Sequence, residues 1–378
     1  MRARWWGAIV LVGVGVASRS ADAQRVVHES TAQWRAAPAL RLVTERRWCT
    51  ELDAPGCDFK QLASVRSLPD GGMLASDARG PLNRFGADGR FVGALGRRGK
   101  GPGEYGFVID AQLASTGLVT WFDNTQMRIA TVRLDGTAGP VTRLMPPFTM
   151  ADLFLVDMQL VILDVPAGAA PGDTVTASYR TVPASGSPTV LARVRTPALF
   201  TVGGEGMIPM RSPFRPFVIG HVGAAGDVAH TNGGRYDVVV APNKQASWRL
   251  IIDMPTRSVT SAEQDSAVAR ALKGFKVSNV ASLPEPVRES FNNAGSTFPP
   301  LRELRVLRDG TLWILPVAEL GATRARWDVF SKDGKRLGRA TLPLGARIWD
   351  GTRDWVLVSE LGEDDAPTVV RYRVHTTP

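Results

Sequence analysis

The chain has 378 residues, 44% of them hydrophobic, and this length permits one large β domain or two smaller ones. Gly (38) and Pro (26) are plentiful, as a turn-rich all-β protein requires. The net charge is +9, but no Lys/Arg block longer than three residues and no nucleic-acid motif accompanies it. We therefore interpret the charge as a solvated basic surface and do not expect nucleic acid as a partner.

Residues 1–23 have the pattern of a secretory signal peptide. Two arginines precede an apolar core at residues 5–17, which is too short for a comfortable membrane span, and residues 21–23 (ADA) form a small-x-small cleavage site. We expect a mature chain that begins at Gln24, is secreted or periplasmic and has no transmembrane segment. An uncleaved N-terminal anchor is the alternative.

Residues 24–39 predict a polar leader, and residues 40–48 are typical of a strand. Cys49 and Cys57 are the only cysteines and flank a turn at residues 53–56. In an oxidising compartment this spacing predicts a disulfide, whereas a metal pair is not expected because the intervening loop contains no histidine.

The stretch from Gln61 to Leu95 predicts four short antiparallel strands. Asp-Gly or Gly-Gly turns at residues 68–72 and 87–90 separate them, and these residue types supply the positive φ of tight hairpins. Four such strands make one blade of a β-propeller. A lone blade cannot bury both of its faces, so several copies must pack around an axis.

Weaker copies of this pattern follow to the C-terminus. They begin near residues 109, 151, 217, 301 and 346. The fold prediction is therefore all-β, a six-bladed β-propeller of four-stranded antiparallel blades that spans residues 40–378. In propellers a terminal strand often joins the last blade, and we assign residues 40–44 to that role as a hypothesis.

Residues 259–295 interrupt the repeat and predict a helical insertion between blades four and five. Residues 261–264 (SAEQ) indicate a capping-box start, and a second short helix is expected over residues 286–292. Four apolar residues of the first helix fall on one face, namely Val268, Ala271, Leu272 and Phe275. Such an insertion either covers a propeller mouth as a lid or packs against a blade edge.

The first blade ends in the loop at residues 96–106 (GRRGKGPGEYG). A blade that ends in a G-x-G-P-G-E-[FY] loop resembles the bacterial exported six-bladed β-propellers, which are similar to NHL-repeat and TolB-like propellers. The resemblance implies the fold and export, and it implies no settled activity.

The same loop contains the candidate ligand-binding residues, which are Arg98, Glu104 and Tyr105. Successive glycine amides and nearby basic side chains are typical of an anion-binding nest. The alternative is a tight crossover to the next blade, in which Glu104 caps backbone amides.

Motifs for a serine nucleophile elbow, a P-loop or a dinucleotide site are absent from the sequence. Hydrolytic propellers of the gluconolactonase type hold calcium in the channel, and the candidate oxygen ligands here are Asp110, Asp152 and Glu303. The chain has only four histidines, namely His28, His221, His230 and His375. His221 and His230 lie nine residues apart across an expected hairpin, but two histidines make a poor zinc site.

The sequence thus favours a secreted or periplasmic binding or scaffold module, monomeric and without a required cofactor. It would recognise a glycan, peptide or protein partner through loops on one face, built from residues 96–107, 195–216 and 259–295. A calcium-assisted hydrolase or lyase with its site in the central channel is the alternative, and a structural partner in an envelope complex is a third, weaker hypothesis.

Overall fold

The computed structural model describes residues 25–51, 54–144, 152–166, 173–197, 200–202, 208–210, 214–243, 245–292, 294–318, 322–362 and 366–376. The predicted signal peptide lies outside the described residues. Within the described part of the chain, no helix is both long enough and apolar enough to span a membrane.

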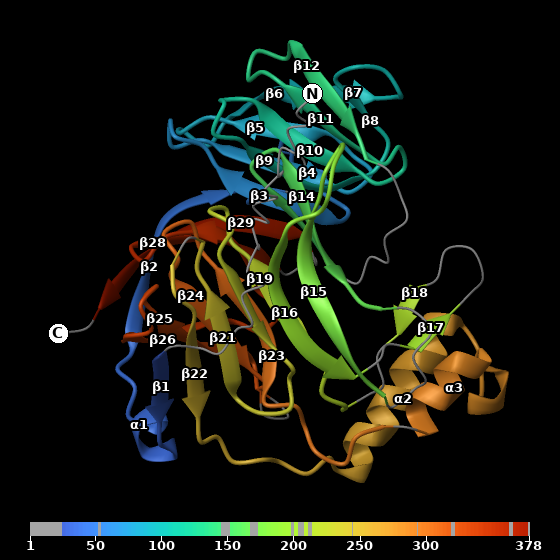
Figure 1. The fold of residues 1–378 in the computed structure, drawn as a ribbon. Helices are drawn as coiled ribbons and strands as arrows, with labels where there is room; N and C mark the ends of the chain where they lie inside the picture. Colours follow the sequence, from blue (N-terminus) through green and yellow to red (C-terminus); the bar gives the residue numbers. More distant parts are fainter. Residues whose placement is uncertain are drawn as a thin grey trace, which may run out of the picture.

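Six blades, each of four antiparallel strands, form a ring as predicted, and the sheet of blade four has a fifth, parallel strand at its edge (Figure 1). Blades one and two hold β3 (Leu62–Ser67), β4 (Met73–Asp77), β5 (Leu82–Phe85), β6 (Phe91–Leu95), β9 (Val108–Leu113), β10 (Val119–Asp123), β11 (Arg128–Val132) and β12 (Ala138–Arg143). Blades three and four hold β13 (Leu153–Val156), β14 (Gln159–Asp164), β15 (Thr174–Val182), β16 (Val190–Pro197), β19 (Ile219–Val222), β20 (Val228–Thr231), β21 (Asp237–Ala241) and β22 (Trp248–Ile252).

Blades five and six complete the ring. They hold β23 (Leu301–Val306), β24 (Leu312–Pro316), β25 (Arg324–Phe330), β26 (Arg336–Pro343), β27 (Arg347–Gly351), β28 (Trp355–Leu361), β29 (Pro367–Thr376) and the N-terminal β2 (Leu40–Trp48). The innermost strands of the six blades are β3, β9, β13, β19, β23 and β27. The short pairs β7 (Arg97–Arg98) with β8 (Glu104–Tyr105), and β17 (Phe200–Val202) with β18 (Ile208–Met210), lie outside the blades.

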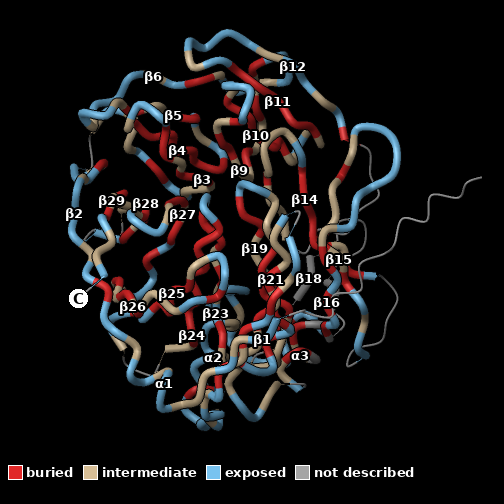
Figure 2. Tube along the Cα trace, turned by 60° about the vertical axis from the view of Figure 1, so that its left-hand side comes forward, coloured by how far each residue is buried: buried red, intermediate tan, exposed pale blue. Residues whose placement is uncertain are grey.

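The core lies between the faces of neighbouring blades. Strands β4, β10, β11 and β24 are buried along their whole length, whereas β6 and β12 at the periphery are largely exposed (Figure 2). Trp121, Trp313 and Trp327 are fully buried in these interfaces. Burying one large apolar side chain stabilises the fold by roughly 1.5–3 kcal/mol, so each blade depends on its neighbours.

Strand β2 closes the ring. It pairs antiparallel with β29 from Leu40 opposite Thr376 to Trp48 opposite Val369. The closing-strand hypothesis is therefore confirmed, and the strand extends beyond the predicted Thr44.

Residues 25–39, which belong to the predicted polar leader, pack on the propeller. Strand β1 (Arg25–Glu29) pairs parallel with β22 of blade four, helix α1 (Thr31–Arg35) follows, and Ala39 bridges to Arg339 of blade five. We call residues 25–48 the N-terminal strap, because they run over blades four, five and six. Mixed polar sequence concealed this role, since β1 buries little apolar surface.

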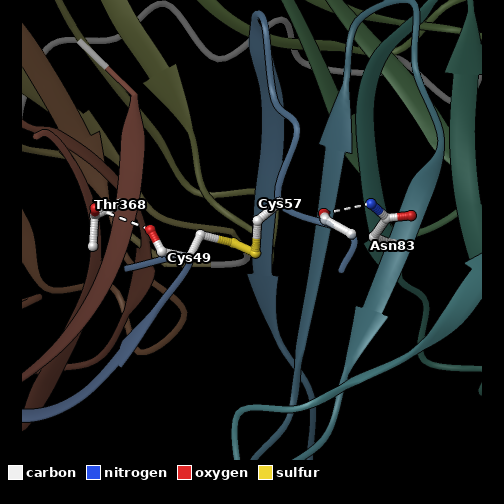
Figure 3. The surroundings of a disulfide bond; sticks show 5 residues. Cys49, Cys57, Asn83 and Thr368 are labelled. Atoms are coloured by element: carbon white, nitrogen blue, oxygen red, sulfur yellow. Dashed lines mark hydrogen bonds between the residues drawn. A yellow bond between two sulfur atoms is a disulfide. The ribbon is translucent and has the colours of Figure 1, made fainter. Parts of the chain in front are cut away.

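The predicted disulfide between Cys49 and Cys57 is present (Figure 3). It links the end of β2 in blade six to the segment that leads into β3 of blade one. The Thr368 hydroxyl donates to the Cys49 carbonyl at 3.1 Å, and the Asn83 amide donates to the Gly56 carbonyl at 2.6 Å. The bridge is thus fastened to both blades that it joins.

The helical insertion between blades four and five is confirmed. It contains α2 (Ser261–Phe275), a 3₁₀ turn at Val280–Ser282 and α3 (Glu285–Asn292), which contacts β17 and β18. The N-cap is Thr260, one residue before the predicted start, because the Glu263 side chain reaches back to the Thr260 amide.

The predicted apolar face of α2 is only partly covered. Val268, Ala271 and Leu272 are half-buried, and Phe275 is 44% exposed. No residue of the insertion is among those that line the central channel, as far as the structure describes them. This arrangement corresponds to packing beside the ring (Figure 1).

Candidate functional site

The central channel is a cavity of about 570 Å³, and the inner strands of all six blades line it. Alternate residues of a strand face opposite sides, so every second inner-strand residue can face the axis. One side chain from each blade forms what we call the channel ring, which consists of Arg66, Asp110, Phe154, His221, Arg305 and Arg347.

Blades one, two and six are joined in the ring by Arg66. Its Nη2 donates to both carboxylate oxygens of Asp110, at 2.9 and 3.0 Å, and its Nη1 donates to the Trp349 carbonyl at 3.0 Å. Asp110 also accepts from the Ser64 hydroxyl at 2.8 Å. These contacts hold both charged groups in fixed positions.

His221 of blade four is a neutral hydrogen-bonding group. Its Nδ1 accepts from the Val306 backbone amide at 3.1 Å, which assigns the ring proton to Nε2. Burial, followed by the charges of Arg305 and Arg66, holds the pKa of His221 well below its usual value. Phe154 of blade three packs edge-on against the imidazole, with ring centroids 5.5 Å apart.

Blade five contributes an arginine that is only partly satisfied. Arg305 Nη2 lies 2.6 Å from Glu303 Oε1, but Arg305 Nε is buried and has no hydrogen-bond partner among the described residues. Farther along the same blade, Arg308 Nε donates to Asp350 at 2.6 Å.

Blade six contributes Arg347, whose guanidinium carbon lies 3.8 Å from the centroid of the Trp349 ring. No ion pair involving Arg347 is found within the described part of the chain. Arg347 is exposed to the open channel. Partial desolvation by the channel walls, and then the neighbouring charge of Arg305, lowers the pKa of Arg347 to about 10. The channel therefore has a positive potential at Arg347, which remains charged at neutral pH.

The carboxylates predicted as calcium ligands have other partners. Asp110 is bound by Arg66, Glu303 lies against Arg305, and Asp152 lines the channel with an interaction of its own. In the described ranges, no group of three or more His, Cys, Asp or Glu side chains is placed to hold a metal ion. This set of oxygen donors does not fit calcium, which requires about six to eight of them.

The structure does not bring the histidines together. In the β19–β20 pair, His221 is opposite Ala229 and His230 is opposite Gly220, so the two imidazoles point to opposite faces of the blade. His28 lies on the N-terminal strap 3.0 Å from Asp253, and His375 lies near the end of β29.

The residues predicted to form a recognition loop have mostly structural contacts. Glu104 accepts from the Gly101 amide at 2.7 Å and from Arg97 Nε at 2.6 Å, and these bonds lower its pKa. Tyr105 is only 4% exposed and packs edge-on against Trp121. Of the three candidates, Arg98 alone has an exposed side chain.

A buried arginine fastens this loop to blade two. Arg128 donates to the carbonyls of Lys100, Gly101 and Glu104, at 3.0, 3.2 and 2.6 Å. The backbone turns at Gly96, where φ is +69° and a Cβ would meet the Gly103 carbonyl oxygen at 2.5 Å. These contacts correspond to the crossover alternative, and none of the loop lines the channel.

The arginines of the channel were not among the site residues predicted from the sequence. Arg66, Arg305 and Arg347 lie in the inner strands β3, β23 and β27, in which apolar residues are mixed with polar and charged ones. An arginine in the inner strand of three of the six repeats was the available signal.

Comparisons with known proteins show no matching family model and no matching curated protein. Among solved structures, a presumed exported protein from Bacteroides fragilis is 13% identical with a TM-score of 0.49, over 93% of this chain and 99% of the other. A DUF4221 family member from Bacteroides vulgatus is 8% identical with a TM-score of 0.49, over 89% and 99%.

Virginiamycin B lyase from Staphylococcus aureus is 9% identical with a TM-score of 0.37, over 88% of each chain. At these identities and TM-scores, the three likenesses carry no argument about activity. The fold assignment rests instead on the strand topology of this chain.

Proposed function

We propose that the protein is a secreted or periplasmic binding module that holds its ligand in the central channel. The observation that carries the proposal is the channel ring, in which charged side chains from several blades are fixed by partners on neighbouring strands. Polar groups fixed before binding lose less conformational freedom when a ligand arrives. The disulfide supports an oxidising compartment.

The size of the channel favours a small ligand or the end group of a larger one. Its volume of about 570 Å³ falls within the range of small-molecule sites, roughly 300–1,000 Å³. A glycan, peptide or protein partner would therefore insert one terminal residue into the channel. The rest of such a partner would contact the rim of the ring.

The proposal is tested by filling the channel. Mature protein (residues 24–378) is screened for binding to small organic acids, glycans and peptides, and the best ligand is then measured with Ala63→Trp, since Ala63 lines the channel. We expect binding to fall at least about tenfold, a difference of about 1.4 kcal/mol. Arg98→Ala, on the loop outside the channel, serves as the matched control.

Melting curves verify that both variants are folded. Unchanged affinity in a folded Ala63→Trp variant would show that the ligand binds elsewhere, and the proposal would then be abandoned.

The calcium-assisted alternative predicts a different result from metal removal. A resident ion at 100 times its dissociation constant stabilises a protein by about 2.7 kcal/mol, which is visible as a higher melting temperature. Because Arg66 and Arg305 occupy the candidate carboxylates, we expect the same melting temperature in calcium and in EDTA. A clear decrease in EDTA, with near-stoichiometric bound calcium, would favour the hydrolase or lyase.

A further inference from the structure

We propose that Arg347 is the centre of a carboxylate-binding subsite in the channel, and that the ligand is a small monocarboxylate with a compact ring. The inference rests on the proposed function, because it names the group that this same channel recognises. It follows from the ion pairs around the channel, from the stacking of the guanidinium on Trp349 and from the aromatic surface beside it.

Four arginines line the channel, and among the described residues Arg347 is the one that forms no ion pair. Arg66 is paired with Asp110, and Arg305 lies against Glu303. A third pair joins Arg308 to Asp350. Arg347 forms no ion pair with any described carboxylate, and Asp152, which also lines the channel, has an interaction of its own.

The stacking of Arg347 leaves its hydrogen-bond donors available. The guanidinium lies 3.8 Å from the Trp349 ring centroid, so the aromatic ring covers one face of the cation. The five N–H groups of arginine lie in its plane. Among the described residues, the Arg347 guanidinium donates no hydrogen bond to a protein acceptor. Two of these donors on one edge match the two oxygens of a carboxylate.

The neighbouring groups add to this recognition. His221 is neutral, since its Nδ1 accepts from the Val306 amide, so its Nε2–H is a donor that carries no additional charge. The side chains of Phe154 and Trp349 give the channel aromatic surface on two sides, and such surface suits the body of a ring compound.

The single unpaired charge favours a monocarboxylate over a phosphate. A carboxylate balances Arg347 one to one, whereas a phosphate dianion would bring a second negative charge into a channel that has no second unpaired arginine among its described ion pairs. An uncompensated charge in a confined site is unfavourable. The low pKa of Arg347, about 10, agrees with a site whose positive charge an anion would stabilise.

The experiment measures the binding of four probes to the mature protein by calorimetry at low salt. The probes are benzoate, D-glucuronate, the neutral analogue benzamide and inorganic phosphate. We expect a carboxylate to bind at least about tenfold more tightly than benzamide and than phosphate. Arg347→Gln should weaken carboxylate binding by the same factor. Arg347→Lys keeps the charge without the planar fork, so its carboxylate affinity should lie between those of Arg347→Gln and the unmodified protein.

Arg98→Gln is the control, because it removes one exposed arginine outside the channel. Its carboxylate affinity should equal that of the unmodified protein. If Arg347→Gln is not folded, Arg347→Lys still supplies the comparison.

Several results would overturn the inference. The first is that neither carboxylate binds. The second is that benzamide binds as tightly as the carboxylates, or phosphate as tightly or more tightly. The third is that folded Arg347→Gln binds the carboxylates as tightly as the unmodified protein. In the last case the Ala63→Trp variant separates the two proposals. If it still abolishes ligand binding, the channel remains the site and only the role of Arg347 fails.

Discussion

At the scale of single residues, His230 is a buried imidazole that the fold keeps uncharged. It is 4% exposed, and neither of its ring nitrogens has a hydrogen-bond partner among the described residues. It stacks on Tyr179, with ring centroids 6.1 Å apart, across the interface between blades three and four. Burial lowers the pKa of His230 from 6.5 to about 4.

This shift predicts an acid-sensitive contribution to stability. Between pH 6.5 and about 4 the unfolded chain binds a proton at His230 that the folded chain does not bind. The free energy of unfolding should therefore fall with decreasing pH across this window, by about 3 kcal/mol in total, and this loss is absent above pH 6.5. Urea unfolding at several pH values measures it.

His230→Phe isolates this effect from other titrating groups, because phenylalanine preserves the stacking but cannot be protonated. The stability difference between the unmodified protein and this variant should change by about 3 kcal/mol over the window. A parallel pH dependence of the two proteins would mean that His230 does not cause the acid sensitivity.

At the scale of elements, the disulfide and the closing strand act on the same seam of the ring. Strand β2 belongs to blade six and is followed directly by Cys49, while Cys57 precedes the first strand of blade one (Figure 3). The bridge therefore limits how far the closing strand can separate from blade one in the unfolded chain.

Removal of the disulfide should lower stability by the entropy of a short closed loop. The two cysteines are eight residues apart, for which the chain-entropy model gives about 2–3 kcal/mol. We expect the Cys49→Ser/Cys57→Ser variant to unfold at a correspondingly lower urea concentration. The unmodified protein in dithiothreitol should behave as the variant does, and the variant should not respond to dithiothreitol. Equal midpoints for oxidised and reduced protein would contradict this role.

At the scale of the whole molecule, the sequence was most informative where turn chemistry repeats. The Asp-Gly turns at residues 70–72 and 88–89 mark hairpins by local backbone requirements, so the blades and their number could be predicted. The same holds for the disulfide and the helical insertion. Hairpin signals act over a few residues, and each blade repeats them.

The channel ring could not be predicted in this way. Its members are distant in sequence and meet only when six blades close, so the partner of Arg66 or the stacking of Arg347 has no local signal. The loop at residues 96–106 has contacts that its local sequence did not indicate. Its glycines and charges resemble a binding motif, but buried Arg128 holds the loop in place.

The N-terminal strap is stabilised by a buried ionic network that spans blades four and five. Asp328, which is 0% exposed, accepts from the Trp34 indole at 2.8 Å, the Tyr236 hydroxyl at 2.8 Å and Arg336 Nη1 at 3.1 Å. Arg336 Nε in turn donates to Glu29 of β1 at 2.9 and 3.0 Å. The strap is therefore part of the folded ring.

Loss of the Glu29 charge should release the strap and destabilise the whole ring. Removing one partner of a buried ion pair costs about 3–5 kcal/mol, because the other charge remains buried, and we expect a loss of this size for Glu29→Ala in urea unfolding. His28→Ala changes the adjacent residue of β1, whose pair with Asp253 is more than half exposed, and should cost at most about 1 kcal/mol. Hydrogen exchange should show faster exchange in β22 and β26 of Glu29→Ala only, because these outer strands contact the strap. Equal stability of the two variants would mean that blades four and five hold together without the strap.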